Sequence, residues 1–356
     1  MAFAKPELSN AERGYHERMA DTIYSRGDPL RSPVSLQSPV SGVRSPVPLL
    51  TSSWDSPTDL QSSLDPQPLA ELTHRVQGKL RLNFGYDRAR AQTVLHVREQ
   101  QQPLKVIRAF PLAHGGALVH VHNLSGGVLG GDHLQLTVEV EPEAYAQLTS
   151  TSATRLYRSR PSAPCAIQTS EVRVAQGALL EYLPDPIIPF AGSRYLQQTR
   201  IVLADGAGLF WWETIAPGRT ACGELFAYDL LQTDFTITAL NRPVAIERYK
   251  LVPSTNEIAS PARLGVYRYY SSFYILKVGV EAAEWARLEG QLNMLARELS
   301  VPGEESWGVS LLVAHGLAVR GISRQGKDIA AGLYAFWRAA KQALYGREAV
   351  LPRKIY

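Results

Sequence analysis

Four acidic residues end apolar stretches of the sequence, where a carboxylate is only partly hydrated and can therefore do chemistry. They are Asp132, Glu181, Glu213 and Glu247. Residues 209–212, which precede Glu213, are too apolar for a solvent-exposed edge, so this carboxylate should lie at the rim of a buried region. A partly buried acid must find a partner or shift its pKa, and such groups are enriched at functional sites. Internal salt bridges produce the same pattern, with Arg219 and Arg248 as candidate partners, and both interpretations stay open.

A glycine-rich segment leads directly into the first of these acids. It contains Gly126, Gly127, Gly130 and Gly131, followed by Asp132. Gly126 and Gly131 have the spacing of a phosphate-binding P-loop, but Asp132 occupies the position of the essential lysine and would repel the phosphates. The glycines instead indicate tight turns or close backbone approach, so the chain is not a nucleotide hydrolase of this type.

Other catalytic and metal-binding patterns are incomplete in this sequence. His120 and His122 share one face of an expected strand and could form half a metal site, but no third ligand follows at a diagnostic spacing. The two cysteines, Cys165 and Cys222, form no CxxC pair and are interpreted as packed thiols. The serine-nucleophile pattern GxSxG and the zinc pattern HExxH are both absent. We therefore assign no catalytic residue, no firm metal ligand and no tightly bound cofactor.

The small net charge of the chain does not favour a nucleic-acid partner. The 356 residues include 37 Lys and Arg against 33 Asp and Glu, a net charge of +4. Arg155, Arg158 and Arg160 form one basic cluster, for which a solvated rim is favoured over a phosphate site. The sequence has neither a signal-peptide pattern nor an apolar run of membrane-spanning length, which predicts a cytoplasmic protein without a membrane partner.

The carboxylates are expected to lie on short strands. Residues 133–140 alternate between apolar and polar side chains with a period of two, as in a half-buried strand. Similar strands are predicted over residues 79–84, 93–98, 117–122, 166–174, 208–213 and 225–237. Because no strand–helix alternation precedes residue 280, the fold class is predicted to be mainly β. On a strand, the neighbours Glu247 and Arg248 would face opposite ways and need different partners.

A weak internal repeat suggests how these strands are arranged. Residues 177–181 and 206–213 each run from a glycine through apolar residues to a glutamate, which hints at a layered, solenoid-like β body. Two helices are predicted in the C-terminal half from apolar residues at helical spacing. These are Trp285, Leu288, Leu292, Leu295 and Leu299 for the first, and Ile329, Leu333, Phe336, Ala340 and Leu344 for the second. Gly346 is placed to end the second helix.

Composition divides the chain into three parts. Residues 1–24 could form a short helix. Residues 25–70 are a Pro/Ser-rich extension, with 8 prolines and 10 serines among the 43 residues from 26 to 68, and are expected to be disordered. Residues 71–356 are the β-rich domain.

The motifs of this domain resemble those of one family, the UreD (UreH) urease accessory proteins. The matching segments are residues 117–132 with their four glycines, 149–159, 179–185, 217–219 with Gly223 and Glu224, 247–248 and 351–355. They cover residues 75–356 in the family's order. The sequence departs from the family in its Pro/Ser-rich extension and in Tyr356, where a tryptophan is common.

The resemblance implies a β-stranded body with a pair of helices and no enzymatic activity. It implies a scaffold that binds UreF, which recruits the GTPase UreG, and an assembly that docks on apo-urease. Nickel would be brought by UreG or UreE and would pass through an internal, water-filled path. Oxygen ligands suit such a path because they hold a divalent cation weakly enough to release it, so nickel is expected only in transit.

We therefore expect the four carboxylates to line or gate this path. The set is Asp132, Glu181, Glu213 and Glu247, with Thr154 as a polar neighbour and Arg219 and Arg248 as structural partners. Two functions of other classes stay open. The first is a carbohydrate-active β-solenoid enzyme with an Asp/Glu pair and exposed aromatics such as Trp211 and Trp212. The second is nucleic-acid binding through the Arg155–Arg160 cluster.

Overall fold

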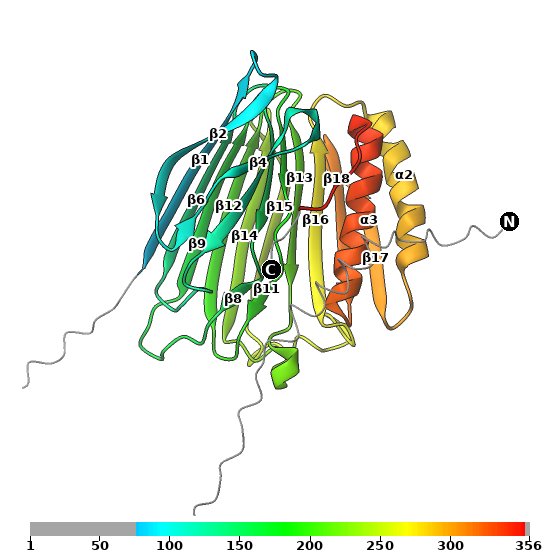
Figure 1. The fold of residues 1–356 in the computed structure, drawn as a ribbon. Helices are drawn as coiled ribbons and strands as arrows, with labels where there is room; N and C mark the ends of the chain where they lie inside the picture. Colours follow the sequence, from blue (N-terminus) through cyan, green and yellow to red (C-terminus); the bar gives the residue numbers. More distant parts are fainter. Residues whose placement is uncertain (1–75, 353–356) are drawn as a thin grey trace, which may run out of the picture. The chain divides into compact units, whose positions relative to one another are not determined.

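The computed structural model describes residues 76–352, which form two β-sheets and a layer of two helices (Figure 1). The predicted N-terminal helix and the Pro/Ser-rich extension lie outside the described residues. The strands are β1 Gln77–Asp87, β2 Gln92–Gln101, β3 Leu104–Lys105, β4 Ala109–Pro111, β5 Ala117–Asn123, β6 His133–Val140, β7 Tyr145–Ser150, β8 Thr154–Leu156, β9 Ala166–Val174, β10 Leu179–Tyr182, β11 Ile187–Pro189, β12 Arg194–Leu203, β13 Gly208–Ile215, β14 Leu230–Ala239, β15 Arg242–Leu251, β16 Tyr269–Lys277, β17 Glu305–Leu311 and β18 Gly316–Ser323. The helices are α2 Ala282–Leu299 and α3 Gly326–Tyr345, with short 3₁₀ turns at Ala113–Gly115 and Thr220–Cys222.

The first sheet has seven strands in the order β15-β14-β12-β9-β6-β1-β2. The five central strands are parallel, and the two edge strands, β2 and β15, return antiparallel. The central strands keep their register without a shift, so residues at equal heights form straight rows across the sheet.

The second sheet has eleven strands, along the main order β17-β18-β16-β13-β10-β7-β5-β3. Strands β5, β7, β10 and β13 are parallel, whereas β16, β18 and β17 continue antiparallel. From β6 to β14 the chain returns to the first sheet at β9, β12 and β14 after one or two strands in the second sheet, so each passage adds one layer to the stack. This arrangement confirms the predicted mainly β, layered body.

The internal repeat corresponds to two adjacent layers of this stack. Gly177 and Gly206 both have positive φ angles, 67° and 65°, and turn the chain into β10 and β13. These strands pair in parallel, but the register places Glu181 beside Phe210. Glu213 lies three residues farther along β13 and therefore faces the opposite side of the sheet.

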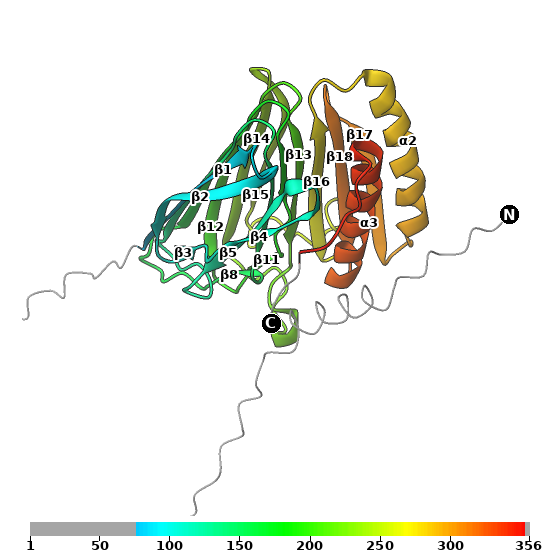
Figure 2. The same cartoon turned by 45° about the horizontal axis from the view of Figure 1, so that its top comes forward.

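The alternation of each strand creates two separate cores. One lies between the two sheets, and the other lies between the second sheet and the helices (Figures 1 and 2). Along β13, Trp211 packs in the first core and Trp212 in the second. Both helices bury the predicted apolar faces, and Gly346 ends α3 in the left-handed conformation with a φ of 61°.

The structure corrects two details of the sequence prediction. The strand expected over residues 225–237 begins only at Leu230, because residues 225–229 continue the loop that follows β13. Cys222 is exposed and Cys165 partly exposed, so the cysteines are free but not packed thiols. Among residues 76–352, no helix is long and apolar enough to cross a bilayer.

Candidate functional site

Two of the predicted carboxylates, Glu213 and Glu247, share a cavity between the sheets. Glu213 comes from β13 in the second sheet, and Glu247 comes from β15 at the edge of the first. The cavity is narrow: its accessible volume of about 10 Å³ has room for about one water molecule. It is lined by Trp211, Glu213, Ile215, Thr233, Phe235, Glu247, Tyr249, Tyr270, Ser272 and Tyr274. We call it the acidic cavity.

Glu247 lies at the centre of a network of hydroxyl groups. Its carboxylate accepts hydrogen bonds from Tyr270 at 2.5 Å, from Tyr274 at 2.5 Å and from Ser272 at 3.0 and 3.1 Å. Arg320 on β18 completes the set with an ion pair of 3.0 Å between Nη2 and Oε2. Burial, and then the negative charge of Glu247, raises the pKa of Tyr270 and of Tyr274, so both phenols remain protonated and donate to the carboxylate.

Glu213 has no such charged partner among the described residues. Its Oε1 accepts a hydrogen bond from the side-chain amide of Gln197, and no Lys or Arg of residues 76–352 forms an ion pair with it. Burial raises the pKa of Glu213 to about 7, with the charge of Glu247 as the second cause. The two carboxylates therefore differ in kind, since one is neutralised by a guanidinium and the other holds a proton up to neutral pH.

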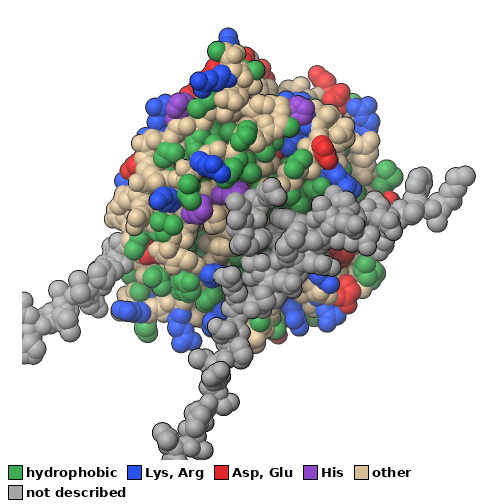
Figure 3. Space-filling view, in the orientation of Figure 1, with side chains coloured by type: hydrophobic (Ala, Val, Ile, Leu, Met, Phe, Trp, Pro, Cys, Tyr) green, Lys and Arg blue, Asp and Glu red, His purple; other side chains and the backbone are tan. Residues whose placement is uncertain are grey.

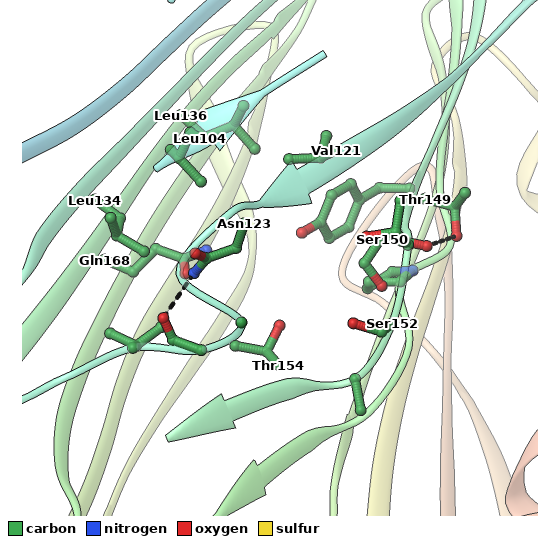
Figure 4. A pocket seen from close by; sticks show the side chains of 17 residues that line it. Leu104, Val121, Asn123, Leu134, Leu136, Thr149, Ser150, Ser152, Thr154 and Gln168 are labelled. Atoms are coloured by element: carbon green, nitrogen blue, oxygen red, sulfur yellow. Dashed lines mark hydrogen bonds between the residues drawn. The ribbon is translucent and has the colours of Figure 1, made fainter. Parts of the chain in front are cut away.

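A second, larger cavity is lined by apolar residues and by neutral polar side chains (Figure 4). Its empty volume is about 730 Å³, open solvent included, and none of its described lining residues carries a formal charge. The polar members are Asn123, Thr149, Ser150, Thr151, Ser152, Thr154, Gln168 and Tyr182. Gly126 and Gly127 contribute backbone to the same wall. We call it the hydroxyl cavity. Its wall includes the predicted residue Thr154 but neither Glu213 nor Glu247.

One row of residues crosses the inner face of the first sheet from one cavity to the other. Strand pairing places Leu134 beside Gln168, Gln168 beside Gln197, Gln197 beside Thr233 and Thr233 beside Tyr249. Leu134 and Gln168 line the hydroxyl cavity, whereas Thr233 and Tyr249 line the acidic cavity. We call Gln168, Gln197, Thr233 and Tyr249 the polar ladder.

Three polar atoms beside this ladder are buried and poorly satisfied. Thr199 Oγ1 has no hydrogen-bond partner within residues 76–352, whereas Thr233 Oγ1 and Trp211 Nε1 lie outside ordinary hydrogen-bond geometry but still interact with Tyr249 and Glu213, respectively. The three residues are 1%, 4% and 2% exposed. Such groups carry a substantial free-energy cost unless water or an ion satisfies them. The stacked rings of Tyr182 and Trp211, with centroids 4.0 Å apart, separate the two cavities on the opposite sheet.

Glu181 lies on the other side of the second sheet, under α3. It is fully buried and forms an ion pair of 2.8 Å with Lys341. Tyr145, Gln147 and Trp337 also donate hydrogen bonds to its carboxylate. With four donors and a charge partner, Glu181 has the environment of a structural ion pair in the helix-covered core, and the sheet itself separates it from the acidic cavity.

Asp132 is also apart from the acidic pair and organises the glycine-rich loop. Its buried carboxylate accepts a hydrogen bond of 2.9 Å from the Leu129 amide. Burial raises the pKa of Asp132, while the backbone amides of Leu129 and Val76 oppose this shift. Gly126 and Gly131 have φ angles of 72° and 93°, so the predicted tight turns occur at these glycines.

Gly127 and Gly130 are required for close packing instead. A Cβ atom on Gly127 would lie 2.6 Å from the carbonyl oxygen of Arg155, and one on Gly130 would lie 2.9 Å from Ser159 Oγ. We expect Gly127→Ala to destabilise the protein by about 2 kcal/mol, as in other overpacked sites, measured by urea unfolding. Gly308→Ala is the control, since its Cβ would meet no heavy atom within 4 Å. Equal stabilities of the two variants would show that the loop can move aside.

The predicted arginine partners pair elsewhere. Arg219 binds Glu224 through two hydrogen bonds, which lowers the pKa of Glu224, and Arg248 pairs with Asp234 on the outer face of the first sheet. The prediction that Glu247 and Arg248 face opposite ways is correct, but neither Arg219 nor Arg248 positions any of the four acids. The residue that does so for Glu247 is Arg320.

The remaining sequence candidates form no site in the described part of the chain. His120 and His122 lie on β5 at the outer face of the second sheet, and no group of three His, Cys, Asp or Glu residues suitable for a metal occurs within residues 76–352. Trp211 and Trp212 are buried, so they offer no aromatic groove for a sugar. Lys and Arg side chains are scattered over the face shown in Figure 3 and form no single stripe there.

Sequence reasoning missed the ladder and the groups around Glu247. They are Gln197, Thr233, Tyr270, Ser272, Tyr274 and Arg320. The available signal was a break in strand alternation, because Gln197 and Thr233 occupy inward positions that apolar residues fill elsewhere on β12 and β14. Arg320 gave no signal, since a lone arginine in a strand is ordinarily exposed.

Comparison with known proteins agrees with this arrangement of motifs. The family model described as UreD urease accessory protein matches residues 76–355. A urease accessory protein UreD from Herpetosiphon aurantiacus is 48% identical over 282 residues, which cover 79% of this chain and 97% of that protein. One from Pseudomonas aeruginosa is 32% identical over 290 residues, covering 80% and 97%. The chain belongs to the UreD family of urease accessory proteins.

Proposed function

We propose that the protein is a non-catalytic scaffold for urease maturation and that its inter-sheet interior conducts nickel to apo-urease. The observation that carries the proposal is the polar ladder, which connects a neutral cavity to an acidic one through a β-sandwich core. Interiors of this kind are normally apolar, because each buried polar group must be satisfied. A row of amides and hydroxyls is explained if water and a passing ion satisfy them.

The donor atoms along this route suit a cation that must be released. The hydroxyl cavity offers neutral oxygens, and the acidic cavity offers two carboxylates from Glu213 and Glu247. Oxygen ligands hold divalent cations less tightly than sulfur and imidazole cages hold transition metals. Nickel would therefore be cargo in transit, and no tightly bound cofactor is proposed.

The proposed partners follow from the family resemblance. UreF would bind this chain and recruit the GTPase UreG, and the assembly would dock on the apo-urease subunits, with UreE acting indirectly as a nickel source. The place of action would be the cytoplasm. A carbohydrate-active function receives no support from the site, because the carboxylate pair is enclosed between the sheets and both tryptophans are buried.

The role in maturation is tested by reconstituting urease with and without the chain. We would co-express the host's urease subunits with UreF, UreG and UreE, purify urease and measure nickel per active site by elemental analysis. Nickel should be lost when this chain is omitted and restored when it is supplied. Full loading in its absence would overturn the proposed function.

The route through the sandwich has a sharper test in two neighbouring glutamines. Gln197 belongs to the polar ladder, whereas Gln198 is the next residue on β12 and faces outward. We expect Gln197→Leu to lower nickel per urease site severalfold, because an apolar side chain would interrupt the hydrated row. Gln198→Leu should leave loading unchanged. Equal loading with both variants would place the nickel route elsewhere.

A further inference from the structure

Four loops follow parallel strands of the second sheet and lie at one end of the two sheets, the lower end in Figure 1. They are residues 124–132 after β5, 157–165 after β8, 190–193 after β11 and 216–229 after β13. We call them the end loops. Main-chain hydrogen bonds connect each loop to the next, from Tyr157 N to Val128 O at 2.9 Å, from Ser159 N to Gly192 O at 3.0 Å and from Gly192 N to Ala227 O at 2.9 Å. The end loops therefore form one continuous surface.

Side-chain contacts hold the end loops in the same arrangement. The Tyr157 hydroxyl donates to the Gly126 carbonyl oxygen at 3.3 Å, and its ring meets that of Phe190 edge-on, with the centroids 5.3 Å apart. The guanidinium of Arg219 lies 4.4 Å from the centroid of the Phe190 ring and forms an ion pair with Glu224. Because the chain makes these contacts by itself, a partner would bind the surface without the entropic cost of ordering four loops.

Three large apolar side chains project from the end loops into solvent. Leu124, Leu129 and Leu225 are 52%, 48% and 43% exposed. The main chain at Leu129 is fixed by the hydrogen bond from its amide to Asp132, and Leu225 directly follows Glu224. Single exposed leucines are ordinary on a protein surface, whereas several on one connected set of loops are typical of an interaction site.

The free charges around these leucines are mostly basic. Arg155 on β8, and Arg158 and Arg160 beyond it, form no ion pair with a described residue, whereas Arg219 is neutralised by Glu224. Asp229 is the one exposed acid of the end loops outside that pair. Partners in a protein complex have complementary potentials, so this surface fits a partner that presents acidic side chains.

The hydroxyl cavity reaches the surface among the same loops. Its wall includes Gly126 and Gly127 of the end loops and residues 151–154, which precede Tyr157. Gly126 and Ser152 are exposed, and Figure 4 shows Ser152 among the polar side chains that surround the cavity. A protein bound to the end loops would therefore lie over a mouth of the hydroxyl cavity.

We propose that the end loops dock a partner protein whose contact face carries acidic side chains around apolar ones. The inference rests on the proposed nickel route and assigns the surface at which a partner reaches the hydroxyl cavity. The partner's apolar side chains pack against the three leucines, and its carboxylates pair with the three free arginines. A nucleic acid would pair with the arginines but leave the leucines uncovered, so a protein is the occupant that fits both features.

The docking surface is tested by titrating the full-length protein with UreF, and the resulting complex with apo-urease. Leu129→Ser and Arg158→Glu should each weaken at least one of these two bindings by about tenfold or more, because an apolar contact or a charge pair is lost. The controls are Ile246→Ser and Arg200→Glu, which alter exposed residues on the outer face of the first sheet and should leave both bindings unchanged. The affected binding of the wild type should also weaken as the salt concentration rises.

Thermal unfolding shows whether a loss of binding reflects a loss of fold. Because the substituted side chains are exposed, each variant should keep the Tm of the wild type. Leu225→Ser, on a different loop, covers the case in which Leu129→Ser disturbs the glycine-rich loop. Unchanged binding of both partners by all three surface variants, or an equal loss in the controls, would overturn the docking surface. These measurements need no nickel, so failure of the proposed function would appear separately, as full urease loading without the chain.

Discussion

Replacing Glu213 by glutamine is expected to make the protein more stable at pH 8, although the residue is proposed to be functional. The pKa of Glu213 is raised to about 7 in the fold, from 4.5 for an unperturbed glutamate, and its neighbours are Glu247, with Arg320 behind it, and the phenols of Tyr249, Tyr270 and Tyr274. A raised acid pKa means that ionisation opposes folding. The penalty is absent below pH 4.5, grows as pH rises to 7, and then stays constant at about 3 kcal/mol.

The stability gain of Glu213→Gln should therefore depend on pH. Thermal unfolding should show a Tm about 5 °C above the wild type at pH 8, and the difference should shrink towards pH 5. Glu139→Gln is the matched control, because Glu139 lies on the outer face between Arg81 and Arg173, at 3.7 Å from each. Its effect should stay below about 1 kcal/mol at either pH. A Glu213→Gln variant that is less stable at pH 8 would mean that the carboxylate has a cationic partner after all.

The same variant separates stability from nickel delivery. If Glu213 only maintained the fold, the more stable glutamine variant would load urease at least as well as the wild type. The proposed route predicts the reverse, a more stable protein that yields urease with severalfold less nickel, because the amide carries no charge to attract the cation. Functional residues often lower the stability of a protein. The Glu213→Gln variant should make this loss of stability measurable.

Breaking the buried pair between Glu181 and Lys341 is expected to have the largest effect on stability. The two side chains are 0% and 4% exposed, and the pair joins β10 to α3 at 2.8 Å. Lys341→Met would leave the Glu181 carboxylate buried without a counter-ion, which typically costs about 3–5 kcal/mol. Because proteins of this kind are stable by about 5–15 kcal/mol, we expect a marked loss of soluble protein and a lower urea midpoint.

A double substitution distinguishes loss of a charge partner from loss of packing. Lys341→Met with Glu181→Leu removes both charges and should recover most of the lost stability, although Tyr145, Gln147 and Trp337 lose an acceptor. Arg248→Met, at an exposed pair, should cost less than about 1 kcal/mol. If the double variant were as unstable as the sum of the single variants, the site would depend on the polar network itself and not on charge balance. Nickel loading per soluble molecule should be unaffected in the double variant.

The two faces of the second sheet place Glu181 and Glu213 in different environments. Glu181 and Glu213 sit on adjacent parallel strands of one sheet, yet one faces the helices and the other faces the opposite sheet. Glu181 has a lysine and three further donors, whereas Glu213 is held by the amide of Gln197 and the indole of Trp211 and forms no ion pair with a described residue. The difference in partners follows from the face, because α3 covers one side and a polar cavity lies on the other.

Local sequence patterns predicted much of the architecture. The alternation over residues 133–140 predicted β6 with its bounds, and the helical spacing around Trp285 and Phe336 predicted both helices. The glycine-rich loop and the motifs after it indicated the family that comparison then showed. These features depend on neighbours within a few residues, so composition and spacing determine them.

Local sequence patterns predicted only part of the candidate site. The sequence marked Glu213 and Glu247 as unusual acids, and the structure places both in one cavity. It also grouped Glu181 and Asp132 with them, although one is under a helix and the other organises a loop. The apparent repeat aligned Glu181 with Glu213, but the strand register aligns Glu181 with Phe210, and an odd displacement along a strand reverses the face.

Local sequence patterns were sufficient to predict the family, the layered β body, the two helices and the carboxylates that end apolar strands. The meeting of Glu213 with Glu247, the cations that pair with Glu181 and Glu247, and the polar ladder between the two cavities follow only from the three-dimensional arrangement. Glu247 and Arg320 are 73 residues apart, and Glu181 and Lys341 belong to different layers. Such pairings depend on how strands and helices stack in space, and no periodicity within one segment carries that information.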